Sequence, residues 1–217
     1  MLTDSFFQKT AFIKVINKQI RYDLDTCLGT GQFGVVYKGI FTGEDGVEQL
    51  AAVKVISSKN YEKFDDDVKL AAAYESEVNA MEQLTYKGCN NIIKILGNWE
   101  DPKQPKSRFI ALEYFGDGSV EDLRERYKNL NYQVPEPLVR HIIADMTEAL
   151  KVLRSNSYEH IYHRDIKPEN IMTVMDNSDY IRFVLIDFGL AREIDIDMTI
   201  KWTVGETGTR AYIDPAM

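Results

Sequence analysis

The sequence has little cysteine, and the two cysteines lie far apart. Among 217 residues only Cys27 and Cys89 are cysteines, and they lack the close spacing of a metal-binding or redox pair. This pattern argues against a disulfide framework and against a zinc site. We therefore expect two free thiols in a reducing compartment.

Positive charge is scarce as well. The chain has 26 Lys and Arg residues against 34 Asp and Glu residues, which gives a net charge of −8. A protein that binds nucleic acid or an anionic membrane through its charge needs the opposite balance. We expect neither as a partner, although a small basic patch for a substrate is compatible with this balance.

Long apolar runs are missing too. The first 18 residues lack a basic segment followed by a continuous apolar run, and no window approaches the ~20 apolar residues that cross a bilayer. There is no internal repeat or low-complexity tract, and the hydrophobic fraction of 44% is ordinary for a folded protein. We predict a soluble, cytoplasmic protein, with a nuclear location left open.

Short apolar runs predict strands in the first half of the chain. The runs span residues 35–41, 50–56, 92–96 and 109–114, separated by turn-forming residues. Residues 68–84 between them predict one long helix. Its apolar face comprises Tyr74, Val78, Met81 and Leu84. Glu77 falls on that apolar face, whereas Glu75 falls on the polar side.

The second half of the chain reads as helical and then as a β-hairpin. Helices are predicted over residues 120–130 and from the prolines at 135 and 137 to residue 153. The apolar stripe of the second helix comprises Ile142, Met146, Ala149, Leu150 and Leu153. A hairpin follows at 171–174 and 181–186 with its turn at 176–179, and residues 187–217 read as loop. The pattern as a whole predicts an α+β fold.

A glycine motif precedes the run at 35–41. Gly29, Gly31 and Gly34 match the pattern G-x-G-x-x-G-x-V, and a strand rather than a helix follows. This context favours a kinase-type phosphate-binding loop over a dinucleotide-binding fold. Glycine lets backbone N–H groups approach phosphate oxygens because no Cβ intervenes. A plain glycine-rich turn is the alternative.

Two charged residues stand in apolar surroundings. Lys54 lies inside the run at 50–56, and an unpaired ammonium group there would be costly. Glu77 lies on the apolar face of the predicted helix, where an unpaired carboxylate would also be costly. We therefore expect Lys54 and Glu77 to pair with each other and Lys54 to bind ATP phosphates. The alternative is a strand-end lysine that reaches solvent and a solvated helix glutamate.

Residues 162–171 (YHRDIKPENI) carry the strongest motif, followed by Asp187-Phe188-Gly189 after a hairpin. These residues resemble the catalytic loop and the metal-binding motif of eukaryotic protein kinases. The resemblance runs from about residue 22 to residue 215. In isolation each acidic or amide residue of the motif could merely cap a turn.

The resemblance implies a role for each polar residue of these motifs. Asp165 would orient the substrate hydroxyl and accept its proton, and Lys167 would steady the γ-phosphate of ATP. Asn170 and Asp187 would supply oxygen ligands to Mg²⁺, which prefers such ligands. The expected cofactors are thus ATP and Mg²⁺.

The same resemblance implies an adenine pocket. Leu112 would guard the back of the pocket, and the backbone from Glu113 to Phe115 would bond the base. Val36, Ala52 and Met172 would sandwich it. Ordinary core packing is the alternative interpretation of these apolar residues.

By resemblance the chain should form a two-lobed fold. Residues 1–19 would be an N-terminal extension, 20–115 an N-lobe with an antiparallel sheet and one long helix, and 116–217 a partial, helical C-lobe. Where the family has Ala-Pro-Glu, this chain has Asp214-Pro215-Ala216. We expect a C-terminal truncation that omits about 80 to 100 residues of a usual domain.

Substrate class and regulation also follow from the resemblance. Lys167 and the segment Gly-Thr-Arg-Ala-Tyr at 208–212 resemble the serine/threonine branch, which implies a protein substrate. Arg164 could bind a phosphothreonine formed by an upstream kinase. The candidate acceptors are Thr203 and Thr207, then Thr199. Two alternatives are a nucleotide-binding or scaffolding fragment without turnover and a small-molecule kinase of related fold.

Overall fold

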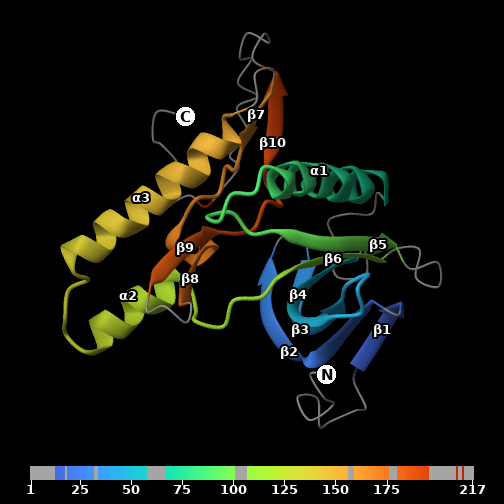
Figure 1. Cartoon of the computed structure of the whole chain (residues 1–217), viewed down its shortest axis with the longest axis horizontal. Helices are drawn as coiled ribbons and strands as arrows, with labels where there is room; N and C mark the ends of the chain where they lie inside the picture. Colours follow the sequence, from blue (N-terminus) through green and yellow to red (C-terminus); the bar gives the residue numbers. More distant parts are fainter. Residues whose placement is uncertain are drawn as a thin grey trace. The chain divides into compact units, whose positions relative to one another are not determined.

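A computed structural model describes most of the chain as two compact units. The described residues are 13–17, 19–31, 34–57, 67–100, 107–155, 159–175, 180–195, 209 and 212. The first unit comprises residues 1–78 and 94–114, and the second comprises residues 79–93 and 115–217. Figure 1 shows the elements of both units.

The first unit is built on a six-stranded antiparallel sheet (Figure 1). Its strands are β1 (Ile13–Asn17), β2 (Ile20–Gly31), β3 (Gly34–Thr42), β4 (Glu48–Ser57), β5 (Ile95–Glu100) and β6 (Ser107–Glu113). They follow the order β1-β2-β3-β4-β6-β5 across the sheet. The strands predicted at 35–41, 50–56 and 109–114 are therefore confirmed as β3, β4 and β6.

The predicted strand at 92–96 is wrong in its bounds. The backbone of residues 91–93 bonds to Leu185 of the second unit, with the Ile93 N–H donating to the Leu185 carbonyl at 3.0 Å. Pairing with β6 therefore starts only at Ile95. The sequence pattern also does not predict β1 and β2, because β1 is short and the second half of β2 is largely exposed and polar.

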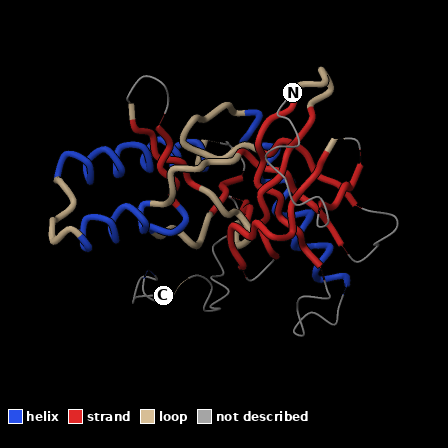
Figure 2. The backbone as a smooth tube through the Cα atoms, turned by 90° about the horizontal axis from the view of Figure 1, so that it is seen from below, coloured by secondary structure: helices blue, strands red, loops and turns tan. Residues whose placement is uncertain are grey.

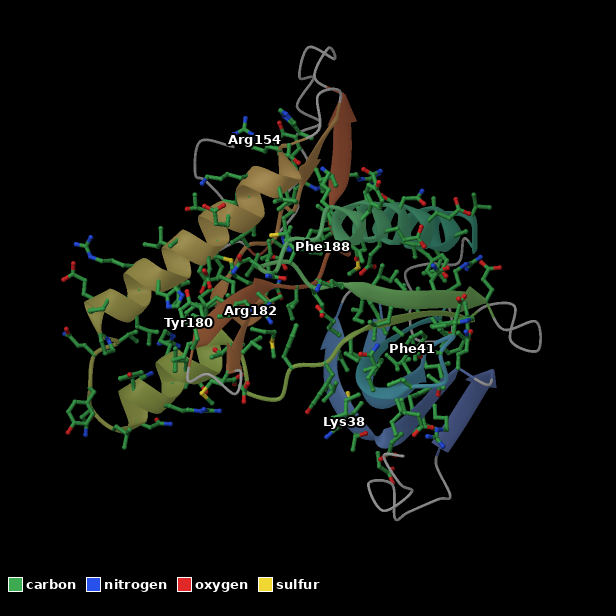
Figure 3. The ribbon with its side chains drawn as sticks, viewed as in Figure 1. Lys38, Phe41, Arg154, Tyr180, Arg182 and Phe188 are labelled. Carbon is green, nitrogen blue, oxygen red and sulfur yellow. The ribbon has the colours of Figure 1, made fainter. Side chains whose placement is uncertain are left out.

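The two faces of this sheet have different partners. One face carries the core cluster, which comprises Ile20, Tyr22, Ala51, Val53, Val55, Phe109 and Ala111. Phe41, labelled in Figure 3, packs beside this cluster with Trp99. The alternate residues of β4 and β6 point to the other face, because side chains alternate along a strand. Lys54 therefore lies on the face opposite the core cluster.

The long helix α1 (Asp67–Tyr86) confirms the helix predicted at 68–84. All four residues of the predicted apolar face, Tyr74, Val78, Met81 and Leu84, are buried. Glu77 is buried among them, and Glu75 is exposed. The helical spacing thus separated the two glutamates correctly.

Helices α2 (Val120–Asn129) and α3 (Glu136–Leu153) belong to the second unit and run side by side (Figures 1 and 2). Ser119 caps α2: its Oγ accepts from the Asp122 N–H, and the Asp122 carboxylate accepts from the Ser119 N–H. This reciprocal pair satisfies two backbone donors at the helix start. Pro135 immediately precedes α3, as the proline signal predicts.

The stripe predicted on α3 is only partly correct. Met146, Ala149 and Leu153 are buried, but Leu150 is 40% exposed. Leu150 lies seven residues after Ile143, which is 60% exposed, and this spacing places both on one face of a helix. No described residue buries that face.

The predicted hairpin is confirmed as β8 (Ile171–Met175) and β9 (Ile181–Leu185), and its turn at 176–179 lies outside the described residues. A short 3₁₀ helix, η4 (Pro168–Asn170), precedes β8. Helix α3 packs against β9, and the Asp145 carboxylate accepts from the Phe183 N–H at 2.8 Å.

The prediction that residues 187–217 form only loop is wrong in one place. Residues Arg192–Asp195 form β10, which pairs antiparallel with β7 (Glu159–Tyr162). Strand β10 is short, and three of its four residues (REID) are charged, so it lacks the apolar alternation that predicts a strand. Most of the remaining tail lies outside the described residues.

Candidate active site

The glycine motif is a β-hairpin between β2 and β3, with Gly31 opposite Gly34. A Cβ atom added to Gly29 or Gly31 would meet nothing within 4 Å, whereas one added to Gly34 would lie 2.7 Å from the Val55 carbonyl oxygen. Gly34 is therefore required by sheet packing. Gly29 and Gly31 leave open space beside an exposed backbone, as an approaching ligand would need.

Lys54 and Glu77 form the expected ion pair. The Lys54 Nζ lies 2.5 Å from the Glu77 Oε1, and both side chains are almost fully buried, with exposed fractions of 7% and 3%. The alternatives of a solvent-reaching lysine and a solvated glutamate are thus wrong. Each charge satisfies the other where an unpaired one would be costly.

Three further predicted residues share the sheet face of Lys54. In the strand register Val36 lies opposite Lys54, and Leu112 lies opposite Ala52. Opposite residues on paired strands point to the same side, and so do residues two apart on one strand. Val36, Ala52, Lys54 and Leu112 therefore face the same side of the sheet, as the adenine-pocket prediction requires.

The segment after β6 is anchored by backbone and side-chain bonds within the first unit. The Glu113 N–H donates to the Lys94 carbonyl at 3.1 Å, and the Glu113 carboxylate accepts from the Lys94 N–H at 3.0 Å. The Lys38 ammonium, labelled in Figure 3, lies 4.9 Å from the centre of the Tyr114 ring. Glu113 and Tyr114 are thus held in place, while Phe115 begins the next part of the second unit.

In the second unit, a polar network surrounds the Asp165 carboxylate. Lys167 Nζ lies 2.9 Å from Asp165 Oδ2, and Asn170 Nδ2 donates to the same oxygen at 3.0 Å. Asn170 Nδ2 also donates to the Asp165 carbonyl at 2.8 Å. The structure therefore brings Asp165, Lys167 and Asn170 together, as the motif predicts.

A hydroxyl group is bound between Asp165 and Lys167. The Thr209 Oγ1 donates to Asp165 Oδ1 at 2.7 Å and accepts from Lys167 Nζ at 2.8 Å. The Thr209 N–H donates to Asp165 Oδ1 at 3.0 Å. Burial favours the neutral acid, but the hydrogen bonds from Lys167 and Thr209 outweigh it and hold the pKa of Asp165 below its usual range. Asp165 is thus an anion at neutral pH.

His163 anchors the start of the loop that carries Asp165. It is 3% exposed, and burial lowers its pKa, so its imidazole is neutral at neutral pH. The Nε2 atom then donates to the Ile186 carbonyl at 2.9 Å, and Nδ1 accepts from the Asp165 N–H at 3.3 Å. The ring also packs edge-on against Phe188, which is labelled in Figure 3, with 4.7 Å between the ring centroids.

The two predicted metal ligands lie at the open end of the β8–β9 hairpin. Ile171 pairs with Leu185, and one step further the Ile186 N–H donates to the Asn170 carbonyl at 2.9 Å. Asp187 follows directly, exposed and in the left-handed region with φ 61°. A non-glycine residue in that conformation is strained, and such strain occurs often at functional sites.

These ligands suit Mg²⁺ bound together with phosphates. The described part of the chain contains no cluster of three or more His, Cys, Asp or Glu side chains that could hold a metal by themselves. Mg²⁺ in phosphoryl-transfer sites is usually held by one or two carboxylates, substrate phosphates and waters. An asparagine and an aspartate with oxygen donors fit that requirement.

Three residues near this network have no role that the sequence motifs predict. Thr209 lies in the noted segment 208–212, so the motif itself offered a signal. His163 lies within the catalytic motif, where a buried ring is not visible from sequence. Arg192 is the third: the Arg164 pKa is lowered first by the burial of Arg164 and then by the positive charge of Arg192. No sequence pattern signals that proximity.

The candidate phosphate acceptors Thr199, Thr203 and Thr207 lie outside the described residues, as does the Asp-Pro-Ala segment at 214–216. Among described residues, no helix is long and apolar enough to cross a membrane.

Comparison with known proteins identifies relatives over nearly the whole chain. A probable serine/threonine-protein kinase of Dictyostelium discoideum is 32% identical over 202 residues, which cover 93% of this chain and 35% of the relative. Calmodulin-binding receptor-like cytoplasmic kinase 3 of Arabidopsis thaliana is 30% identical over 189 residues, 87% of this chain and 33% of the relative. The chain thus spans about a third of the length of these relatives.

A family model described as the protein kinase domain matches residues 22–217. The match contains the glycine hairpin, the Lys54–Glu77 ion pair and the Asp165 network. The chain belongs to the protein kinase family.

Proposed function

We propose that this chain is a protein serine/threonine kinase that transfers the γ-phosphate of ATP to protein hydroxyls with the help of Mg²⁺. The observation that carries the proposal is the hydroxyl bound between Asp165 and Lys167. The Asp165 carboxylate accepts a hydrogen bond from the Thr209 hydroxyl at 2.7 Å, while the Lys167 ammonium group donates to the same hydroxyl oxygen at 2.8 Å. A substrate serine or threonine presents the same chemical group.

Asp165 would orient the incoming hydroxyl and accept its proton. An ionised carboxylate within hydrogen-bond reach of the hydroxyl is the first requirement for a general base. The lowered pKa of Asp165 keeps it ionised at neutral pH. Lys167 would then stabilise the negative charge of the transferred phosphoryl group.

The first unit would bind the nucleotide. Lys54 would hold the phosphates, with Glu77 fixing the direction of its ammonium group. The exposed backbone at Gly29 and Gly31 would approach the phosphate oxygens. Val36, Ala52 and Leu112, together with the backbone of Glu113 and Tyr114, would contact the adenine. The other two predicted adenine contacts, Phe115 and Met172 of β8, belong to the second unit.

Asn170 and Asp187 would hold Mg²⁺. Both contacts of the Asn170 side chain to Asp165 use Nδ2, so Oδ1 is the atom that would face a cation. Mg²⁺ bound there would neutralise the charge on the phosphates. The strained backbone at Asp187 would aim its carboxylate toward the same ion.

Phosphorylation between Asp187 and Pro215 would regulate activity. Two guanidinium groups, Arg164 and Arg192, lie close enough to influence each other electrostatically. A pair of arginines is suited to bind a phosphate group. An upstream kinase would modify Thr203 or Thr207, with Thr199 a weaker candidate. If Thr203→Ala and Thr207→Ala, singly and together, leave activity unchanged, this regulatory proposal is wrong.

A nucleotide-binding or scaffolding protein without efficient turnover is the second candidate. The exposed face of α3 with Ile143 and Leu150 favours it, because an uncovered apolar surface is suited to bind a partner.

Phosphorylation of a mixed peptide library with γ-labelled ATP separates the two candidates. A kinase produces labelled phosphoserine and phosphothreonine, and Asp165→Asn abolishes the label. Nucleotide binding without any labelled peptide supports the second candidate, and phosphotyrosine as the main product contradicts the serine/threonine assignment.

A further inference from the structure

Besides the Lys54–Glu77 ion pair, a second contact joins α1 to the sheet, and it involves a residue on the same cross-strand line as Lys54. Ile110 of β6 lies opposite Lys54 of β4 on one side and opposite Asn98 of β5 on the other. Residues opposite one another across paired strands point to the same face. The side chains of Lys54 and Asn98 therefore project toward α1 from positions about two strand spacings, or ~10 Å, apart.

Helix α1 contacts both positions. The Tyr74 hydroxyl donates to Asn98 Oδ1 at 3.1 Å, while Glu77 pairs with Lys54 at 2.5 Å. Tyr74 and Glu77 are three residues apart, so they are neighbours on one helix face. Figure 1 shows α1 lying along β5, consistent with these contacts. Two contacts from neighbouring side chains fix both the position of the helix and its rotation about its axis.

Arg108 restrains the ring that carries this hydroxyl. Its guanidinium carbon lies 5.8 Å from the centre of the Tyr74 ring, and its Nε lies 2.8 Å from Glu100 Oε1. Arg108 is two residues from Ile110 on β6 and so faces the same side of the sheet. It is opposite Glu100 in the register, which makes the ion pair a cross-strand pair. The Arg108 side chain is only 13% exposed, so it is held in a defined place.

We propose that Tyr74, Asn98 and Arg108 form a positioning cluster that keeps Glu77 within reach of Lys54. Tyr74 is 6% exposed and touches neither nucleotide nor peptide in the proposed function, so its effect would act through the ion pair. Losing the hydroxyl contact would let α1 rotate, and the Lys54–Glu77 pair would be made for a smaller fraction of the time. This inference rests on the proposed function only where phosphoryl transfer is the readout.

The test uses Tyr74→Phe, which removes only the hydroxyl, in the full chain. Asn98→Ala removes the acceptor of the Tyr74 hydroxyl. Asn98→Asp keeps an oxygen acceptor at this position and should therefore behave like the wild-type chain. Tyr86→Phe is the matched control, because Tyr86 is on the same helix but 94% exposed.

We expect Tyr74→Phe to accelerate amide hydrogen exchange in residues 70–80 by roughly two- to tenfold, the range of one typical net hydrogen bond. Exchange in β2 and β3 should not change. The side-chain ammonium signal of Lys54 in ¹⁵N NMR should broaden or shift, because the pair with Glu77 is made less often. Neither readout requires catalysis, so each remains valid even if the chain phosphorylates nothing.

If the proposed function holds, Tyr74→Phe should lower kcat by a similar factor while the peptide KM stays unchanged. In a Glu77→Gln background, Tyr74→Phe should have no further effect on kcat, because the pair that it positions is already lost. A purely structural role gives a lower melting temperature, an unchanged Lys54 signal and a multiplicative loss of kcat with Glu77→Gln. That result overturns the proposal.

Discussion

In the first unit the charged residues of the candidate site are almost completely buried, whereas in the second unit they are partly exposed and belong to a network. Lys54 and Glu77 are 7% and 3% exposed and pair with each other. Lys167 and Asp165 are 20% and 10% exposed, and Thr209 and Asn170 also bond to Asp165.

Because of this difference in burial, we expect substitutions in the two units to affect different properties: stability in the first unit and catalysis in the second. Removing one member of a buried pair leaves an uncompensated charge that the fold must carry. In the second unit a lost member leaves neighbours and water that still solvate the carboxylate. We therefore expect substitutions in the first unit to affect stability strongly, and those at Asp165 to affect mainly catalysis.

The largest expected effect is on catalysis in the second unit. Asp165→Asn keeps the shape of the side chain but cannot accept the substrate proton, so kcat should fall by about 10²- to 10⁴-fold. The thermal unfolding midpoint should change little, because the amide oxygen can still accept from Lys167 and the amide N–H can donate to the Thr209 hydroxyl oxygen. A variant that unfolds but retains full kcat at low temperature would contradict the comparison.

The largest expected effect on stability is in the first unit. Glu77→Ala leaves Lys54 buried without its carboxylate and should lower the free energy of unfolding by about 3–5 kcal/mol. The double substitution Lys54→Met with Glu77→Leu replaces the pair by apolar groups and should recover most of that loss. Urea unfolding measures both. A loss below about 1 kcal/mol for Glu77→Ala, the range of an exposed pair, would show that the pair is not effectively buried.

A smaller effect is expected from Thr209→Val. The substitution removes one hydrogen bond to Asp165 and one from Lys167, while the Thr209 N–H contact remains. Because this bond favours the ionised carboxylate, the pKa of Asp165 should rise toward its ordinary value. Titration of the ¹³C-labelled carboxyl by NMR measures the shift. An unchanged pKa would mean that the hydroxyl contact contributes nothing to the network.

The smallest effect on folding is expected on the exposed face of α3. Ile143→Gln and Leu150→Gln should each change the free energy of unfolding by less than about 0.5 kcal/mol, as at ordinary surface positions. They should nevertheless reduce self-association, because exposed apolar patches promote it. Sedimentation velocity measures association, and Met146→Gln on the buried face is the control that should destabilise. Association unchanged in both surface variants would show that this face is not responsible.

Local patterns predicted the α+β fold and several of its elements well. Helical spacing identified the buried face of α1 and distinguished Glu77 from Glu75, because periodicity directly reports which side of a helix is apolar. The motif at 162–171 identified Asp165, Lys167 and Asn170 because its residues are close in sequence. Their detailed roles in catalysis stay predictions.

Long-range pairing could not be predicted from sequence. The bonding of residues 91–93 to Leu185, the β7–β10 ladder and the contact of Thr209 with Asp165 all join segments far apart in the chain. Neither hydrophobic period nor turn chemistry encodes such partners. Leu150 was misplaced for a related reason: an apolar residue on a helix marks a face but does not identify what covers it.

The proposed function requires that the chain binds ATP together with Mg²⁺ held by Asp187 and Asn170. Isothermal titration calorimetry of the 217-residue chain with ATP, in the presence and absence of Mg²⁺, tests this claim most directly. We expect Mg²⁺ to strengthen ATP binding in the wild-type chain and Asp187→Ala to abolish this dependence. Equal ATP affinity with and without Mg²⁺ in the wild-type chain would contradict it.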